Sequence, residues 1–107
     1  MSLPVLIQPR AEADIRGIAA WWSKNRSPEQ AARWWDGILE AIESLGEAPE
    51  RCALARENPK HPCELRSLNF GLGSSPTHRI LFTIRPEAVH VLTIRHTAQD
   101  DWDPDEV

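Results

Sequence analysis

Four basic side chains in the last part of the chain have the chemistry to recognise or process an anion: Arg66, Arg79, Arg95 and His96. A guanidinium group binds phosphate or carboxylate through two parallel hydrogen bonds. An imidazole ring titrates near neutral pH, so His96 is the best candidate for proton transfer. We therefore expect a surface that meets either RNA phosphate or the carboxylates of a docked peptide. The alternatives are arginines paired with local acids and a histidine that is only structural.

No other arrangement of catalytic residues is visible in the sequence. Serine, cysteine and aspartate do not form a nucleophile constellation, and no phosphate-binding loop is present. Cys52, His61 and Cys63 supply only three ligands, and their spacing is not that of a zinc site. We expect two reduced thiols, no metal and no cofactor.

Charge is distributed unevenly along the chain. The net charge is −4, but residues 100–107 hold five of the 16 acidic residues, which leaves twelve basic against eleven acidic residues in 1–99. Ten of those eleven lie in 12–64, so the sequence predicts an acidic helical layer and a basic sheet. We expect residues 1–99 to form one domain and residues 100–107 an acidic tail that folds over the arginines.

The length and composition indicate a small globular protein. The chain of 107 residues has room for a single core, and its contents of 41% hydrophobic and 26% charged residues are ordinary. No apolar run is long enough to span a membrane, and the N-terminus lacks the features of a signal peptide. We therefore expect a cytoplasmic location and no membrane partner.

Six elements position the candidate side chains. A short strand at 3–8 precedes a helix at 10–25, and Ser27-Pro28-Glu29-Gln30 is a capping box that begins a second helix ending near Leu45. Three strands follow an irregular connection at 46–63 and cover 64–70, 78–84 and 88–96. The order β-α-α-β-β-β predicts an α+β fold, with a helical hairpin packed on one face of a small, mainly antiparallel sheet.

Alternation along the strands predicts which side chains face the helices. The inward set of the last two strands is expected to be Ile80, Phe82, Ile84, Leu92 and Ile94. Arg79 and Arg95 would then share the outer face, where Arg66 can join them.

Each predicted helix carries a pair of tryptophans. Trp22 and Trp35 fall on the apolar stripes, whereas Trp21 and Trp34 fall at their flanks. Helix packing accounts for such pairs in most proteins, but a flanking tryptophan can also anchor a partner.

This order of signals resembles the ParE/RelE superfamily of bacterial type II toxins, also called plasmid stabilisation proteins. The resemblance covers about residues 3–102 and rests on PRAEADIRGIAAWW, SPEQAARWWDGILEAIESLGEAPER, ELRSLNFG, HRILFTI and VHVLTIRHTAQDDW. It implies the β-α-α-β-β-β fold and a cognate antitoxin that wraps around the toxin and masks its active surface.

The resemblance leaves two activities open. In the RelE-like branch, which cleaves mRNA on the ribosome, it implies that Arg66 and Arg79 stabilise the phosphate and that His96 transfers a proton. The ParE-like branch binds DNA gyrase and has no established catalytic residues.

Departures from the RelE-like pattern favour the ParE-like branch. The chain has no tyrosine, only two lysines and an acidic tail. We therefore expect a toxin that acts by binding, with partner contacts made by Arg66, Arg79, Arg95, His96, Trp21 and Trp34. The alternatives are a ribosome-dependent endoribonuclease and a degenerate, non-toxic relative.

Overall fold

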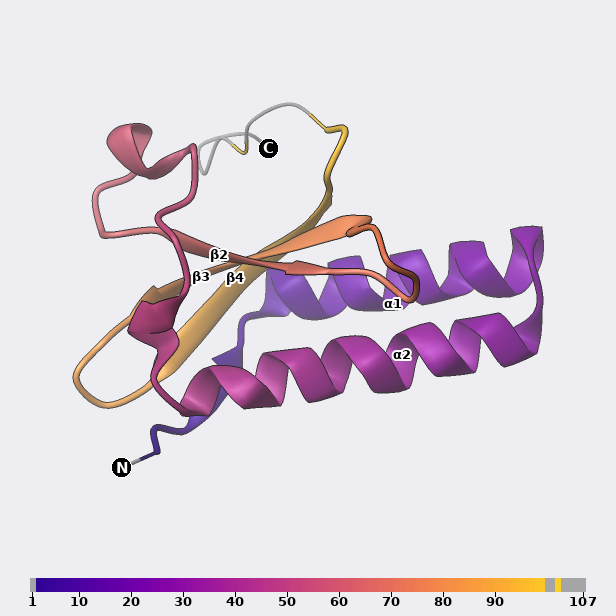
Figure 1. Cartoon of the computed structure of the whole chain (residues 1–107), viewed down its shortest axis with the longest axis horizontal. Coiled ribbons are helices and arrows are strands. Elements are labelled where there is room, and N and C mark those ends of the chain that lie inside the picture. The colour runs from indigo at the N-terminus through magenta and orange to yellow at the C-terminus, as the bar shows by residue number, and fades with distance from the viewer. Residues whose placement is uncertain (1, 100–101, 103–107) are drawn as a thin grey trace.

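The fold is an open four-stranded sheet with two helices on one face (Figure 1). The computed structural model describes residues 2–99 and 102. Along the chain the elements are β1 (Val5–Ile7), α1 (Pro9–Asn25), α2 (Pro28–Glu43), β2 (Arg66–Phe70), β3 (His78–Ile84) and β4 (Val89–His96). The strands lie in the order β1-β4-β3-β2, and β1 pairs with β4 in parallel while the other pairs are antiparallel. The α+β prediction is confirmed.

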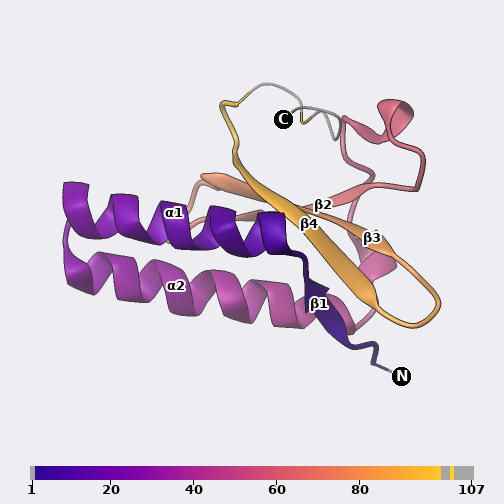
Figure 2. The ribbon, with the colours of Figure 1, turned by 180° about the vertical axis from the view of Figure 1, so that it is seen from behind.

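The helix boundaries follow from local sequence. Pro9 and Pro28 each occupy the first turn, where a missing N–H costs no hydrogen bond. The side chain of Ser27 accepts a hydrogen bond from the backbone N–H of Gln30 at 3.1 Å, as the predicted cap requires. The two helices run antiparallel, and Figure 2 shows their connecting turn reaching beyond the end of the sheet.

Trp34, not Trp35, lies at the centre of the main core. Trp34 is fully buried and Trp35 half-buried, with the Arg16 guanidinium 5.9 Å from the centre of the Trp35 ring. The inner face of α2 consists of Ala31, Trp34, Ile38 and Ile42. The prediction that Trp34 lies at the flank is therefore wrong, because α2 is rotated by about one residue relative to the expected stripe.

A β-bulge in β4 changes which side chains face the helices. Leu81 pairs with Thr93 but Phe82 pairs with Val91, so Leu92 is an extra residue on β4. Val89 and Val91 consequently join the main core, whereas Leu92 packs on the opposite face. The prediction that Leu92 faces the helices is wrong for this reason.

The outer face of the sheet is covered as well. Residues 53–65 cross it and, together with Trp102, form what we call the outer cover (Figure 1). Beneath it lies a second apolar cluster, made of Ala55, Leu65 and Leu81 with Leu92 and Trp102 against them. The cover also pairs with β2 through a bridge between Leu54 and Arg66. Neither face of the sheet is therefore open along its whole length.

A carboxylate on α1 accepts hydrogen bonds from the part of β4 that has no neighbouring strand on one side. β1 pairs only with Val89–Val91, which leaves the rest of β4 without a neighbouring strand on that side. Asp14 accepts hydrogen bonds there from the Thr93 hydroxyl and, at 3.1 Å, from the Ile94 backbone N–H. An edge strand with unpaired backbone groups can pair with another chain, and the hydrogen bonds to Asp14 occupy these groups of β4.

No helix in the described part of the chain is long and apolar enough to cross a membrane.

Candidate functional site

Arg79 is held in a buried ion pair beneath the outer cover. Its two terminal nitrogens donate to the two carboxylate oxygens of Glu57, Nη1 to Oε1 at 2.9 Å and Nη2 to Oε2 at 2.7 Å. Arg79 is 7% exposed and Glu57 is 1% exposed. Oε2 of Glu57 also accepts the backbone N–H of Trp102 at 2.9 Å. Arg79 does point to the outer face as predicted, but the prediction that this face is an open surface is wrong there.

The Glu57 carboxyl is ionised in this setting. Burial acts to raise its pKa, but hydrogen bonds from Arg79 and from the Trp102 amide outweigh that effect and lower the pKa to about 2. Arg79 and Glu57 therefore neutralise each other inside the protein, and an anionic partner does not reach this arginine in the structure.

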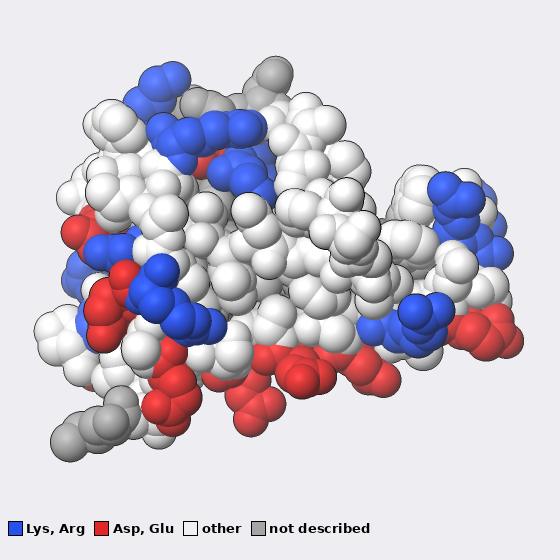
Figure 3. Space-filling view, viewed as in Figure 1, with Lys and Arg blue, Asp and Glu red and all other residues white. Residues whose placement is uncertain are grey.

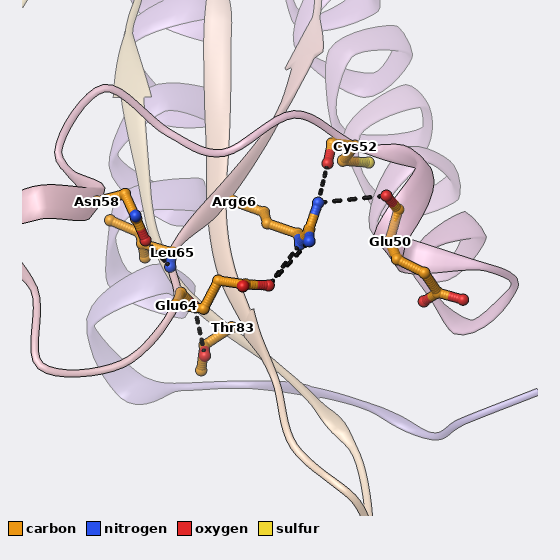
Figure 4. A network of polar contacts seen from close by, with 7 residues as sticks. All are labelled: Glu50, Cys52, Asn58, Glu64, Leu65, Arg66 and Thr83. Carbon is orange, nitrogen blue, oxygen red and sulfur yellow. Dashed lines mark hydrogen bonds and ion pairs between the residues drawn. The ribbon is translucent and has the colours of Figure 1, made fainter.

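Arg66 ties β2 to the outer cover at Glu64 and to the segment just before the cover, at Glu50 and Cys52 (Figure 4). Its Nε donates to the Glu64 carboxylate at 3.0 Å, and its Nη1 donates to the backbone carbonyls of Cys52 and Glu50. Figure 4 also shows the Thr83 hydroxyl donating to the Glu64 carbonyl at 2.8 Å. The donors of Arg66 are thus directed at the chain itself, and its contact with a partner stays a prediction.

Arg95 lies directly opposite Arg79 in the β3–β4 register and is 8% exposed. Arg56 adds a further tie between the cover and the C-terminal segment, because its Nη2 donates to the Gln99 carbonyl at 2.7 Å. The acidic tail, apart from Trp102, lies outside the described residues, and its predicted contact with the arginines stays a prediction.

His96 is exposed at the end of β4 and lies against a second, buried histidine. The rings of His78 and His96 are 5.3 Å apart, and the Trp34 ring is 5.4 Å from His78 on the core side. Burial, helped by the neighbouring His96, lowers the pKa of His78 to about 4, so His78 is neutral at physiological pH. Nδ1 of His96 accepts the Ala98 N–H at 3.0 Å, which leaves Nε2 as the hydrogen-bond donor of the ring.

The residues expected of a nuclease are not brought together. Arg66 pairs with Phe82 and His96 pairs with His78, so they are four residues apart along β3. At about 3.3 Å per residue this separation is roughly 13 Å. Arg79 lies between them but is paired with Glu57. Groups that stabilise one transition state must lie within hydrogen-bonding distance of the same phosphate, and in this structure the donors of Arg66 and Arg79 are directed at the chain itself.

A pocket of about 480 Å³ opens where the helical hairpin overhangs the end of the sheet. We call it the tip pocket. Its apolar wall is formed by Ile18, Trp21 and Trp22 of α1. Arg26 follows α1, Thr77 precedes β3, and the sheet contributes His78 and His96. The predicted flank position of Trp21 is confirmed, since this residue is 51% exposed at the pocket.

Sequence reasoning found Trp21 and His96 but missed Trp22, Arg26 and His78 as their neighbours. A signal was available for the two histidines. One stands at the start of β3 and the other at the end of β4, and the first and last residues of adjacent antiparallel strands meet. Trp34, predicted to contact a partner, instead supports the pocket from below through His78.

The lining of the tip pocket combines apolar and polar side chains. Its described lining offers an apolar wall, one permanent cation, two imidazoles and the Thr77 hydroxyl, a combination that can hold an apolar group beside an anion. Among the described residues no three histidine, cysteine or acidic side chains are grouped so that they could hold a metal ion.

Comparison with known proteins gives a family match and a structural match. A family model described as the ParE toxin of a type II toxin-antitoxin system, parDE, matches residues 5–101. A solved structure of the chromosomal ParDE TA system from P. aeruginosa is similar with a TM-score of 0.72, covering 89% of this chain and 96% of that chain at 18% identity. No curated protein matches the chain.

Proposed function

We infer the function of this chain from its family, because it belongs to the ParE toxins of type II toxin-antitoxin systems. We propose that it acts in the cytoplasm by binding a cellular protein, with DNA gyrase as the first candidate. A cognate antitoxin, the partner that such systems imply, would neutralise the toxin by masking its binding surface.

The arrangement of the basic residues carries this proposal. The RelE-like alternative would place Arg66, Arg79 and His96 around one phosphate, but Arg79 is buried against Glu57 and Arg66 donates to Glu64 and to the Cys52 carbonyl. Side chains that can contact a partner line the tip pocket instead, where the indoles of Trp21 and Trp22 lie next to Arg26. Such a combination is typical of a protein-binding site.

The test is induced expression without an antitoxin, followed by growth measurement and primer extension on bulk mRNA. We expect growth arrest with intact mRNA, and inhibition of gyrase supercoiling by the purified chain. The same expression plasmid with a stop codon in place of the Gly46 codon controls for the burden of expression.

Two outcomes would contradict the proposal. Arrest with new codon-linked cleavage sites would make the protein a ribosome-dependent endoribonuclease. Unaffected growth at high expression would make it a non-toxic relative.

A further inference from the structure

We propose that the tip pocket binds a short acidic and apolar peptide segment of a partner protein. A bulky apolar side chain of that segment would lie against Trp21 and Trp22, and a carboxylate next to it would meet Arg26 and His96. This inference deepens the proposed function by naming a surface and the chemistry of its partner, and it rests on that function only for the partner's identity.

The apolar wall of the tip pocket has the shape of an anchor site. Trp21 and Trp22 are perpendicular, with ring centres 5.7 Å apart, so they form two sides of a corner. Trp22 is half-buried and Trp21 is 51% exposed, whereas tryptophan is highly buried on average. The volume of about 480 Å³ lies within the range of ligand pockets. It accommodates a large side chain together with some of its backbone.

The cationic side of the tip pocket is available, unlike the arginines of the sheet. Within the described residues the Arg26 guanidinium has no ion-pair or hydrogen-bond partner, whereas Arg66 and Arg79 donate to the chain itself. The Ala98 amide fixes the His96 ring so that its Nε2 donates. An arginine and an imidazole N–H on one pocket match a carboxylate in charge and in hydrogen bonding.

The charge of the surrounding surface favours a short segment over a nucleic acid. Figure 3 shows acidic side chains along the edge where α2 runs, and basic side chains with an acidic one beside them at the far end of the helical hairpin. A nucleic acid strand needs a succession of cations, but His78 is neutral and the whole chain carries a net charge of −4. A single carboxylate beside an apolar side chain requires only Arg26 and the N–H group of His96 to bind it.

Binding is tested on the purified full chain with three small probes. N-acetyl-L-tryptophan carries a carboxylate, N-acetyl-L-tryptophanamide lacks it, and uridine 5′-monophosphate represents a nucleotide. Titrations are followed by NMR through the indole N–H signals of Trp21 and Trp22 and the ring signals of His96. We expect the acid to shift these signals and to bind about tenfold more tightly than the amide, since the charged contact is lost in the amide.

Matched variants separate the pocket from general electrostatics. Arg26→Gln should abolish the preference for the acid over the amide. Arg33→Gln, which removes an exposed arginine on α2 outside the pocket, should keep that preference. Both side chains are exposed, so both variants should fold, as circular dichroism can verify.

Four outcomes would overturn the inference: no shifts at the pocket, equal affinity for acid and amide, tighter binding of the nucleotide, or equal losses in the two variants. The proposed function fails in a different assay. If the chain does not arrest growth or inhibit gyrase, the function is wrong, whereas probe binding at the tip pocket is measured without gyrase.

Discussion

The two faces of the sheet are held by different forces. On the helix face, Trp34, Ile38 and Phe82 meet in a core of apolar side chains supplied by regular elements. On the outer face, an irregular connection places Glu57 on Arg79 and brings backbone carbonyls to Arg66. Basic residues that the sequence presents as a binding surface are thereby used to hold the fold. The side chains that we propose for partner binding lie in the tip pocket, where the two faces of the sheet end under the helical hairpin.

The difference decides how each face responds to change. Apolar packing loses stability in proportion to the volume removed. A buried ion pair contributes little net stability when intact, but breaking it leaves an uncompensated charge and costs several kcal/mol. The helix face should therefore lose stability in proportion to the volume removed, whereas the outer cover should respond to the loss of a single charge.

The largest effect is expected on the helix face. Trp34→Ala should lower the free energy of unfolding by about 4 kcal/mol, because it leaves a cavity in the main core. Trp35→Ala, at the half-buried neighbouring position, is the control and should cost about 1 to 2 kcal/mol. Urea denaturation measures both. Equal losses would mean that the two indoles share the core.

The outer cover is tested by breaking and then replacing its ion pair. Glu57→Gln should cost about 3 kcal/mol in urea denaturation, since it removes one charge of an ion pair whose side chains are 8% and 1% exposed. The double variant Glu57→Met with Arg79→Met should recover most of that loss. Glu12→Gln, which breaks the exposed pair with Arg16, should change stability by at most about 0.5 kcal/mol. A double variant no more stable than Glu57→Gln would contradict the electrostatic account.

The pH dependence of stability should separate the two faces. The pKa of His78 falls from 6.5 to about 4 on folding, so the folded state binds fewer protons and stability is lost as the pH falls from 6.5 towards 4. The pKa of Glu57 falls from 4.5 to about 2, so its contribution is present above pH 4.5 and is lost between there and pH 2. Each window corresponds to about 3 kcal/mol.

The free energy of unfolding, measured as a function of pH in two variants, assigns each pH window to one residue. His78→Gln should remove the upper window and Glu57→Gln the lower one. Loss of both windows in either variant would show that the faces are coupled and unfold together with acid.

A substitution at the β4 edge, which lies on neither face of the sheet, should lower the free energy of unfolding by a smaller amount. Asp14→Ala removes the acceptor of the Thr93 hydroxyl and the Ile94 N–H, and should cost about 1.5 kcal/mol. Amide hydrogen exchange should accelerate at Ile94. Arg10→Gln, which removes only the exposed ion pair with Asp14, is the control and should leave exchange unchanged.

The smallest effect should be a gain. Ala48 has a φ of 44°, in the left-handed region that favours glycine. Ala48→Gly should raise the free energy of unfolding by about 1 kcal/mol, because relief of strain exceeds the added entropy of the unfolded chain. Thermal unfolding measures the shift, and a lower melting temperature would contradict it.

Local signals made the fold predictable from sequence. Pro9, the Ser27 cap and the alternation in β3 act within a few residues, and the structure confirms the elements that they indicate. The rotation of α2 that buries Trp34 depends on tertiary packing, and no glycine or proline marks the bulge at Leu92.

The site was less predictable, because its key contacts join distant residues. Glu57 lies in a connection without periodicity and meets Arg79, 22 residues later, only after the cover has crossed the sheet. The sequence around Arg79 does not indicate that Glu57 will be its ion-pair partner. The tip pocket likewise depends on how far the hairpin overhangs the sheet, which propensities do not give.

The parallel pairing of β1 with β4 has a consequence for synthesis. Val5 takes its place beside Val89, so the first strand has no neighbour until the last one has left the ribosome. At about 5 to 20 residues per second, that interval is roughly 4 to 17 s. During this interval the helical hairpin exposes the apolar side chains that later pack against β3 and β4, and exposed apolar surface of this kind favours aggregation. The nascent chain therefore cannot assemble the tip pocket, which needs His96, before its translation is nearly finished.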